Sequence, residues 1–151
     1  MTSHRRLAVG LLVSLFAAGC GDSGFVKAKG HIIKAGQPYL TGPGEGFRIV
    51  FAPIELQSTT QYDSYAASYN PRDGSFIVTG KNNKGLPPGN YRVGLQLMKS
   101  KEDLLNGRLL GKKSPLVAEV TAGRNDIVID LDQAHFDELL AAAPTKKPKS
   151  R

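Results

Sequence analysis

The chain has 151 residues, of which 22% are charged and 40% hydrophobic, a composition that excludes a disordered acidic chain and a polytopic membrane protein. The net charge of +7 is concentrated at the two ends, because Arg5, Arg6 and four basic residues among the last six account for most of it. From Cys20 to Ala143 the sequence is almost neutral and lacks the basic stripe of a nucleic-acid surface, so nucleic acid is excluded as the main partner.

Residues 1–19 have the organisation of a secretory signal. Residues 1–6 are short and positively charged, residues 7–18 are almost wholly apolar, and the run ends in small residues before Cys20. The apolar run is shorter than the roughly 20 residues that a membrane-spanning helix needs. The sequence therefore predicts a signal peptide that is removed during export.

Cys20 is the only cysteine and directly follows this segment. The arrangement resembles the lipobox of bacterial lipoproteins, although Ala17 stands three residues before the cysteine, where that family most often has Leu. The resemblance implies lipid attachment at Cys20 by several palmitate-like acyl chains, because one chain anchors a protein only marginally. Residues 20–24 would then be a lipidated tether on the periplasmic or outer side of a cell-envelope membrane. The alternative is a plain secreted protein with a free thiol.

Residues 25–131 are predicted to form a β-domain. Apolar and polar residues alternate along several short segments, which is the pattern of half-buried strands, and turn residues separate the segments. Asp73-Gly74 between two such segments predicts a hairpin turn. The inward residues are expected to include Val93, Leu95, Ile127 and Ile129. The predicted strands, about seven in number, lie near residues 26–32, 47–51, 65–69, 76–78, 91–97, 116–120 and 127–131.

Residues 132–143 are predicted to form a short helix. Asp132 would cap it, and Phe136, Leu139 and Leu140 would give it one apolar stripe. Residues 144–151 contain Pro, Thr, Lys and Ser with nothing to bury, which predicts a disordered basic tail.

Four turn motifs follow one another in a specific order. They are Gly36-Gln-Pro38, Phe51-Ala-Pro53, Asp73-Gly74-Ser-Phe76 and Pro88-Gly89-Asn-Tyr91. Across residues 25–98 this order resembles the transthyretin-like, or carboxypeptidase-regulatory-like, domain of small bacterial envelope lipoproteins. The resemblance implies an all-β, seven-stranded antiparallel Greek-key sandwich of the Ig-like kind, and no general catalytic activity.

The residues themselves favour no catalytic, metal or cofactor site. His31 and His135 are the only histidines after the signal, and the one cysteine is assigned to lipid. A catalytic triad needs a nucleophile, a base and an orienting acid within mutual reach, and His31 on an exposed strand face and His135 on the predicted helix are more simply solvated residues. A zinc site needs a larger group of Cys and His ligands. The sequence therefore predicts a protein that is not an enzyme and uses no cofactor.

Two groups of residues are candidates for a ligand or partner surface. Tyr62, Tyr65 and Tyr69 could form an aromatic platform for a sugar, although core packing is the simpler interpretation. Leu104 and Leu105 lie in the long connection 99–115, and such connections are either functional or cover a sheet edge.

Together these observations predict a membrane-anchored envelope lipoprotein with a non-catalytic binding or scaffold module. The alternative hypothesis is a module that binds glycan or peptidoglycan through surface tyrosines. An envelope protein or a glycan is accordingly the expected partner. A third hypothesis, that the protein is a hydrolase, is the least favoured.

Overall fold

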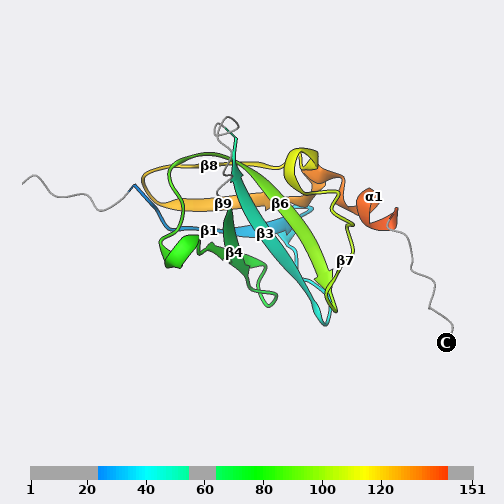
Figure 1. The fold of residues 1–151 in the computed structure, drawn as a ribbon. Helices are drawn as coiled ribbons and strands as arrows, with labels where there is room; N and C mark the ends of the chain where they lie inside the picture. Colours follow the sequence, from blue (N-terminus) through cyan, green and yellow to red (C-terminus); the bar gives the residue numbers. More distant parts are fainter. Residues whose placement is uncertain (1–23, 55–63, 143–151) are drawn as a thin grey trace, which may run out of the picture.

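The computed structural model describes residues 24–54 and 64–142. The predicted signal peptide, Cys20, Tyr62 and the predicted tail at 144–151 lie outside these described residues. Within them the chain is mostly β-structure, with one short α-helix and three 3₁₀ turns (Figure 1). The strands are β1 (Ala28–Lys34), β2 (Gln37–Pro38), β3 (Glu45–Pro53), β4 (Tyr65–Tyr69), β5 (Ser75–Val78), β6 (Gly89–Lys99), β7 (Glu102–Asp103), β8 (Val117–Val120) and β9 (Asn125–Asp130).

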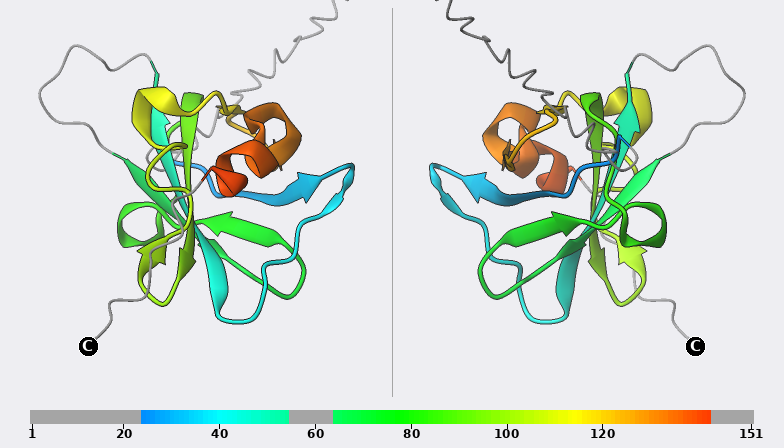
Figure 2. Two further views of the ribbon diagram at one scale, coloured as in Figure 1. Left: turned by 90° about the vertical axis from the view of Figure 1, so that its right-hand side faces the viewer. Right: turned by 90° about the vertical axis from the view of Figure 1, so that its left-hand side faces the viewer.

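These strands form one curled sheet. One path of paired strands runs β9-β1-β5-β4-β3-β6-β8, and the two-residue strands β2 and β7 pair antiparallel with the ends of β1 and β6. The longest pairing joins β3 to β6, from Glu45 opposite Lys99 to Pro53 opposite Tyr91. The views along the sheet show that it bends back on itself, so that β1 and β6 lie on opposite sides of a wedge (Figure 2).

The prediction of a wholly antiparallel sheet is wrong at one pair. β1 and β9 run parallel, with Gly30 opposite Ile127, whereas the other strand pairs of the described chain are antiparallel. A parallel pair needs a long crossover, and here the whole domain from β2 to β8 separates the two strands in sequence. Alternation within a strand predicts which side chains are buried but carries no information about the direction of the neighbouring strand.

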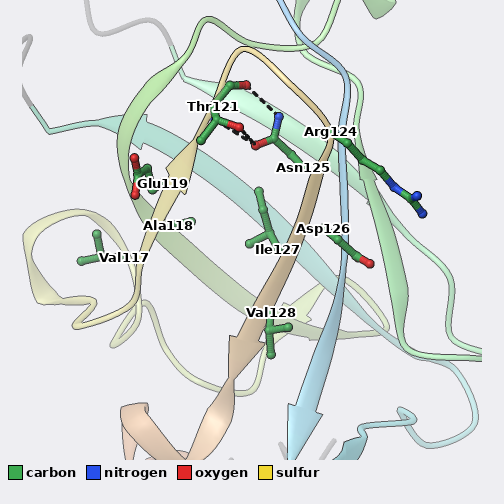
Figure 3. A pocket seen from close by; sticks show the side chains of 9 residues that line it. All are labelled: Val117, Ala118, Glu119, Thr121, Arg124, Asn125, Asp126, Ile127 and Val128. Atoms are coloured by element: carbon green, nitrogen blue, oxygen red, sulfur yellow. Dashed lines mark hydrogen bonds between the residues drawn. The ribbon is translucent and has the colours of Figure 1, made fainter.

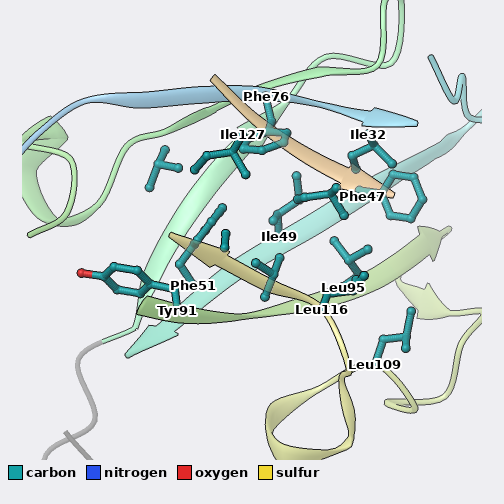
Figure 4. Close-up of a cluster of buried hydrophobic side chains, with 14 of the residues drawn as sticks. Ile32, Phe47, Ile49, Phe51, Phe76, Tyr91, Leu95, Leu109, Leu116 and Ile127 are labelled. Atoms are coloured by element: carbon teal, nitrogen blue, oxygen red, sulfur yellow. The ribbon is translucent and has the colours of Figure 1, made fainter. Parts of the chain in front are cut away.

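The predicted inward faces are confirmed. Val93, Leu95, Ile127 and Ile129 belong to one buried cluster that fills the wedge (Figure 4). Along β1, β8 and β9 buried and exposed residues alternate, as the period of two along a strand requires. Aromatic rings fill the wedge at one end, where Phe47 contacts Tyr39, Tyr69 and Phe136 at ring-centroid distances of 5.8, 5.3 and 6.0 Å.

The hairpin predicted at Asp73-Gly74 joins β4 to β5. The amide of Asn70 donates to the carbonyl of Ser75 at 2.8 Å, and the carboxylate of Asp73 accepts from the amide of Ser75 at 2.9 Å. Gly74 has a φ of +73°, which a glycine adopts without steric cost. The side chain of Asp73 and the missing side chain of Gly74 thus shape the turn together.

The single helix predicted for 132–143 is instead two short pieces. A 3₁₀ turn, η3, spans Leu131–Ala134, and α1 spans Phe136–Ala141, with His135 between them in the left-handed conformation (φ 49°, ψ 43°). The carboxylate that caps η3 belongs to Asp130, which accepts from the amide of Asp132, rather than to Asp132 itself. The break turns Phe136 into the core, where it is fully buried.

Two further 3₁₀ turns, η1 (Lys81–Asn83) and η2 (Gly111–Lys113), lie in connections. The predicted connection 99–115 contains β7, η2 and a turn in which Asp103 accepts from the amides of Leu105 and Gly107. Arg108 from this segment donates to the carbonyls of Leu139 and Ala142 at 2.8 and 2.7 Å, which fastens it to α1. The connection is therefore an ordered part of the domain, and its strand β7 pairs with the C-terminal end of β6.

Candidate functional site

A groove of about 360 Å³ lies between β8 and β9 (Figure 3). β8 pairs with β6 and β9 pairs with β1, and within the described chain the facing edges of the two strands do not pair with each other. The sheet therefore stays open at this place, although the two strands follow one another directly in the sequence.

The closed end of the groove is the turn from β8 to β9, and Asn125 holds it together. The side-chain oxygen of Asn125 accepts from the amide of Thr121 at 2.8 Å, and its side-chain nitrogen donates to the carbonyls of Thr121 and Gly123 at 2.9 and 3.0 Å. Asn125 is buried, so these bonds satisfy a polar group that burial would otherwise penalise. The turn thus fixes one end of the groove while the strands diverge from it.

The inner wall of the groove is apolar. Ala118 and Ile127 line it, and at 7% exposure each they are the most accessible members of the buried cluster. Ile127 points into the space between the two strands (Figure 3). The groove is therefore a place where solvent reaches the edge of the hydrophobic core.

The outer rim carries two large apolar side chains at positions where a solvent-facing strand residue is normally polar. Val117 on β8 is 56% exposed and Val128 on β9 is 58% exposed, and both line the groove. In the sequence these valines occupy the outward phase of the alternation in β8 and β9. An apolar residue in the outward phase of both strands is the one sequence signal that could have indicated this site, although the predicted ligand surface did not include Val117 or Val128.

Charged residues flank the groove unevenly. Glu119 lies on β8, Asp126 on β9 and Arg124 in the turn between them. Arg124 and Asp126 point away from the gap toward β1 (Figure 3), where His31 Nδ1 lies 3.8 Å from the carboxylate of Asp126. Glu119 and Asp126 are both exposed, but Asp126 lies beside His31 of β1 rather than at the gap.

A second, smaller depression of about 250 Å³ lies on the outer face of β3 and β6. Arg48, Gln96 and Arg92 line it, with Gly94 between them. The guanidinium of Arg92 already donates to the carbonyl of Ser114 at 2.6 Å. Because this arginine holds the segment that leads into β8, the depression has a structural role, and the β8–β9 groove is the stronger candidate for a binding site.

The predicted tyrosine platform is not formed by the tyrosines that the structure describes. Tyr65 is buried, with its ring 6.0 Å from that of Tyr91 and 6.4 Å from that of Phe25. Tyr69 is half-buried, and its hydroxyl donates to the carbonyl of Tyr39 at 3.0 Å. Burial also raises the pKa of Tyr69. Both side chains face inward from β4, so the prediction that they form a ligand surface is wrong. Tyr62 lies outside the described residues.

The predicted leucine surface is likewise corrected. Leu105 is fully buried, and Leu104 is partly buried against the same cluster. The amide of Leu104 donates to the carbonyl of Leu97 at 2.8 Å, which holds the segment against β6. Sequence spacing alone could not distinguish a leucine that covers the core from one that faces a partner.

The two histidines of the described residues lie on different elements and have different carboxylate neighbours. His31 is on the outer face of β1, and His135 is in the break before α1, 3.8 Å from the carboxylate of Glu138. Within residues 24–54 and 64–142 no three His, Cys, Asp or Glu residues gather as a metal site would need. The same part of the chain contains no helix with the length and apolar character to cross a bilayer.

Comparisons of the chain with protein-family models, with curated proteins and with solved structures returned no match in any of the three.

Proposed function

We propose that this protein is a lipid-anchored protein of the bacterial cell envelope whose β-domain is a non-catalytic binding module. The observation that carries the binding role is the groove between β8 and β9, where the edge of the core meets solvent and two strand edges face each other unpaired. Exposed apolar side chains at a groove are typical of interaction sites.

The proposed anchor rests on the sequence. A basic segment, an apolar run of signal-peptide length and small residues precede Cys20, which is the position of the lipid-bearing cysteine in the lipoprotein pattern. The described domain begins at Gly24. A tether of a few residues spans at most about 3.5 Å per residue, so an acylated Cys20 would keep the domain and its groove close to the membrane.

We further propose that the fold is a variant of the transthyretin-like Greek-key sandwich. The seven-strand path, the turn at Asp73-Gly74 and the Pro88-Gly89 turn that opens β6 support this assignment. The parallel pairing of β1 with β9 is the feature in which the chain departs from the all-antiparallel pattern.

The anchor is tested by the mass of the N-terminal peptide of the protein isolated from bacterial membranes. We expect this peptide to begin at Cys20 and to carry acyl chains, and we expect the protein to stay with membranes at high salt. High salt removes electrostatic adsorption of the basic ends but not insertion of acyl chains. Cys20→Ser should yield an uncleaved precursor or a soluble form, whereas the neighbouring change Ser23→Ala, which keeps the thiol, should behave as wild type.

An unmodified Cys20, or a mature terminus at another residue, would contradict the anchor. The binding role is tested separately by placing a photo-crosslinking amino acid at Val128 in the groove and, as a matched control, at Ile77. Ile77 is 56% exposed on β5 and does not line the groove. Absence of crosslinks at every exposed strand position in living cells would contradict a binding module.

A further inference from the structure

We propose that the β8–β9 groove takes an extended peptide segment of a partner protein as an additional strand, with apolar and cationic side chains alternating along it. This inference rests on the binding role proposed above and names the chemistry of its partner. It identifies the recognition mode as strand addition, in which main-chain hydrogen bonds supply affinity and alternate side chains supply specificity.

The backbone of the two strands is the first argument. An unpaired strand edge presents alternating N–H and carbonyl groups, and in the groove two such edges face the same gap. A ligand that satisfies both edges needs donors and acceptors in alternation along both of its own sides. An extended peptide has this property, and adding it would continue the sheet from β8 to β9.

Strand direction is compatible with such an insertion. From β8 through β6, β3, β4, β5 and β1 each pairing is antiparallel, and the last, from β1 to β9, is parallel. β8 and β9 therefore run in opposite directions. An inserted peptide is antiparallel to one of them and parallel to the other, and the β1–β9 pair shows that this sheet accommodates a parallel ladder.

The inner face of the groove determines one half of the peptide pattern. Side chains of a strand alternate between its two faces, so every second residue of the peptide would point toward Ala118 and Ile127. These two residues are at the accessible edge of the core. A β-branched apolar residue there would bury its own surface and the remaining exposed surface of both neighbours.

The outer face determines the other half. Glu119 on β8 is exposed and would become a lateral neighbour of the outward residues of the peptide, whereas Asp126 and Arg124 point away from the gap toward β1 (Figure 3). Opposite charges on adjacent strands attract, whereas like charges repel. Outward lysines or arginines are therefore favoured over outward acids, and their aliphatic stems would cover the exposed Val117 and Val128.

The inference is tested with the full chain purified in detergent and a synthetic peptide, acetyl-Lys-Val-Lys-Val-Lys-amide. We expect the peptide to slow hydrogen exchange, by about tenfold at saturation, at those amides of β8 and β9 that are not bonded to β6 or β1. Two matched peptides are the controls. One carries N-methyl groups on its valines, which removes the donors, and the other has glutamate in place of lysine, and both should bind at least about tenfold more weakly.

Variants of the protein give the second readout. Val128→Lys and Glu119→Lys place a cation on the rim and should each weaken binding of the lysine peptide by about tenfold, because like charges then adjoin. Ile77→Lys makes the same kind of change on β5, outside the groove, and should leave binding unchanged. All of these side chains are exposed, so the variants are expected to fold, which thermal unfolding checks.

Equal binding of the N-methylated peptide, or no protection of β8 and β9, would overturn the inference. Protection that rises with protein concentration in the absence of peptide would also overturn it, by identifying a second copy of the chain as the occupant. Crosslinks from other surfaces but none from Val128 would overturn this inference and leave the proposed binding role intact. If the N-terminal peptide carries no acyl chains at Cys20, the proposed anchor is contradicted, and the peptide-binding test is unaffected.

Discussion

Gly30 on β1 lies directly against the carbonyl oxygen of Ile127 on β9. The two residues are partners in the parallel pair, and a Cβ atom added to Gly30 would lie 1.9 Å from that oxygen and 2.6 Å from the ring of Phe76. Real Cβ atoms do not approach other atoms so closely. The missing side chain of Gly30 therefore allows Phe76 and β9 to pack against β1 together.

Gly30→Ala should accordingly lower the free energy of unfolding by about 3 kcal/mol or more, since β9 or Phe76 must move away. Gly46→Ala is the matched control. Gly46 also lies in a strand, has no atom within 4 Å of an added Cβ, and should tolerate alanine. Urea denaturation of both variants measures the difference, and equal stabilities would show that the close approach of β9 is wrong.

Leu95→Ala should lower the free energy of unfolding by about 2–5 kcal/mol through lost burial and the cavity left behind. Leu95 is fully buried, opposite Ile49 on β3 and bridged to Leu109. A domain of this size has about 5–15 kcal/mol of stability in total, so the loss is easily measured. The exposed Ile77 is the control, and Ile77→Ala should change stability by less than about 0.5 kcal/mol. Similar small effects in both variants would place Leu95 outside the core.

His135 should tolerate glycine better than any β-branched residue, contrary to ordinary helix propensities. Its left-handed backbone between η3 and α1 costs a non-glycine residue about 1–2 kcal/mol, which glycine avoids at some cost in chain entropy. We expect His135→Gly to be neutral or slightly stabilising and His135→Val to be destabilising, by thermal unfolding. The opposite order would mean that residues 131–141 form one continuous helix, as the sequence pattern suggested.

Tyr91 should make stability depend on pH in the alkaline range. Its ring is buried, and burial raises its pKa from 10.0 to about 12, while its hydroxyl donates to the carbonyl of Pro87 at 2.6 Å. The unfolded chain loses this proton first as the pH rises. The contribution of Tyr91 is therefore fully present below pH 10 and decreases as the pH rises from about 10 to about 12.

Denaturation at a series of pH values checks this prediction, with Tyr91→Phe as the comparison. The variant should be less stable at neutral pH by about 0.5–1.5 kcal/mol, because the Pro87 carbonyl loses its donor. It should also lose the part of the alkaline destabilisation that Tyr91 causes. An unchanged alkaline profile in the variant would assign that destabilisation to other groups, such as Tyr39 and Tyr69, whose pKa values burial also raises.

The sequence by itself determined the elements and their inward faces. Alternation of side chains is a local property of an extended strand, so it identified Leu95 and Ile127 as core residues and placed a turn at Asp73-Gly74. The short C-terminal helix was also predicted in place, although the left-handed His135 that divides it was not. The break at His135 accompanies the burial of Phe136 in the core, and a local pattern does not describe such tertiary packing.

Only the tertiary structure decided which strands become neighbours and which edges stay open. The parallel pairing of β1 with β9 depends on contacts between residues almost a hundred positions apart, and it leaves β9 facing β8 without a ladder between them. The same long-range packing buries Tyr65 and Leu105, which were predicted to lie at the surface. It also leaves Val117 and Val128 exposed on the outer face, although both side chains are apolar. Burial is a property of the assembled layers, whereas period two is a property of each strand alone. The outward valines were therefore the only hint of the groove in the sequence, and its open strand edges were decided by the tertiary structure.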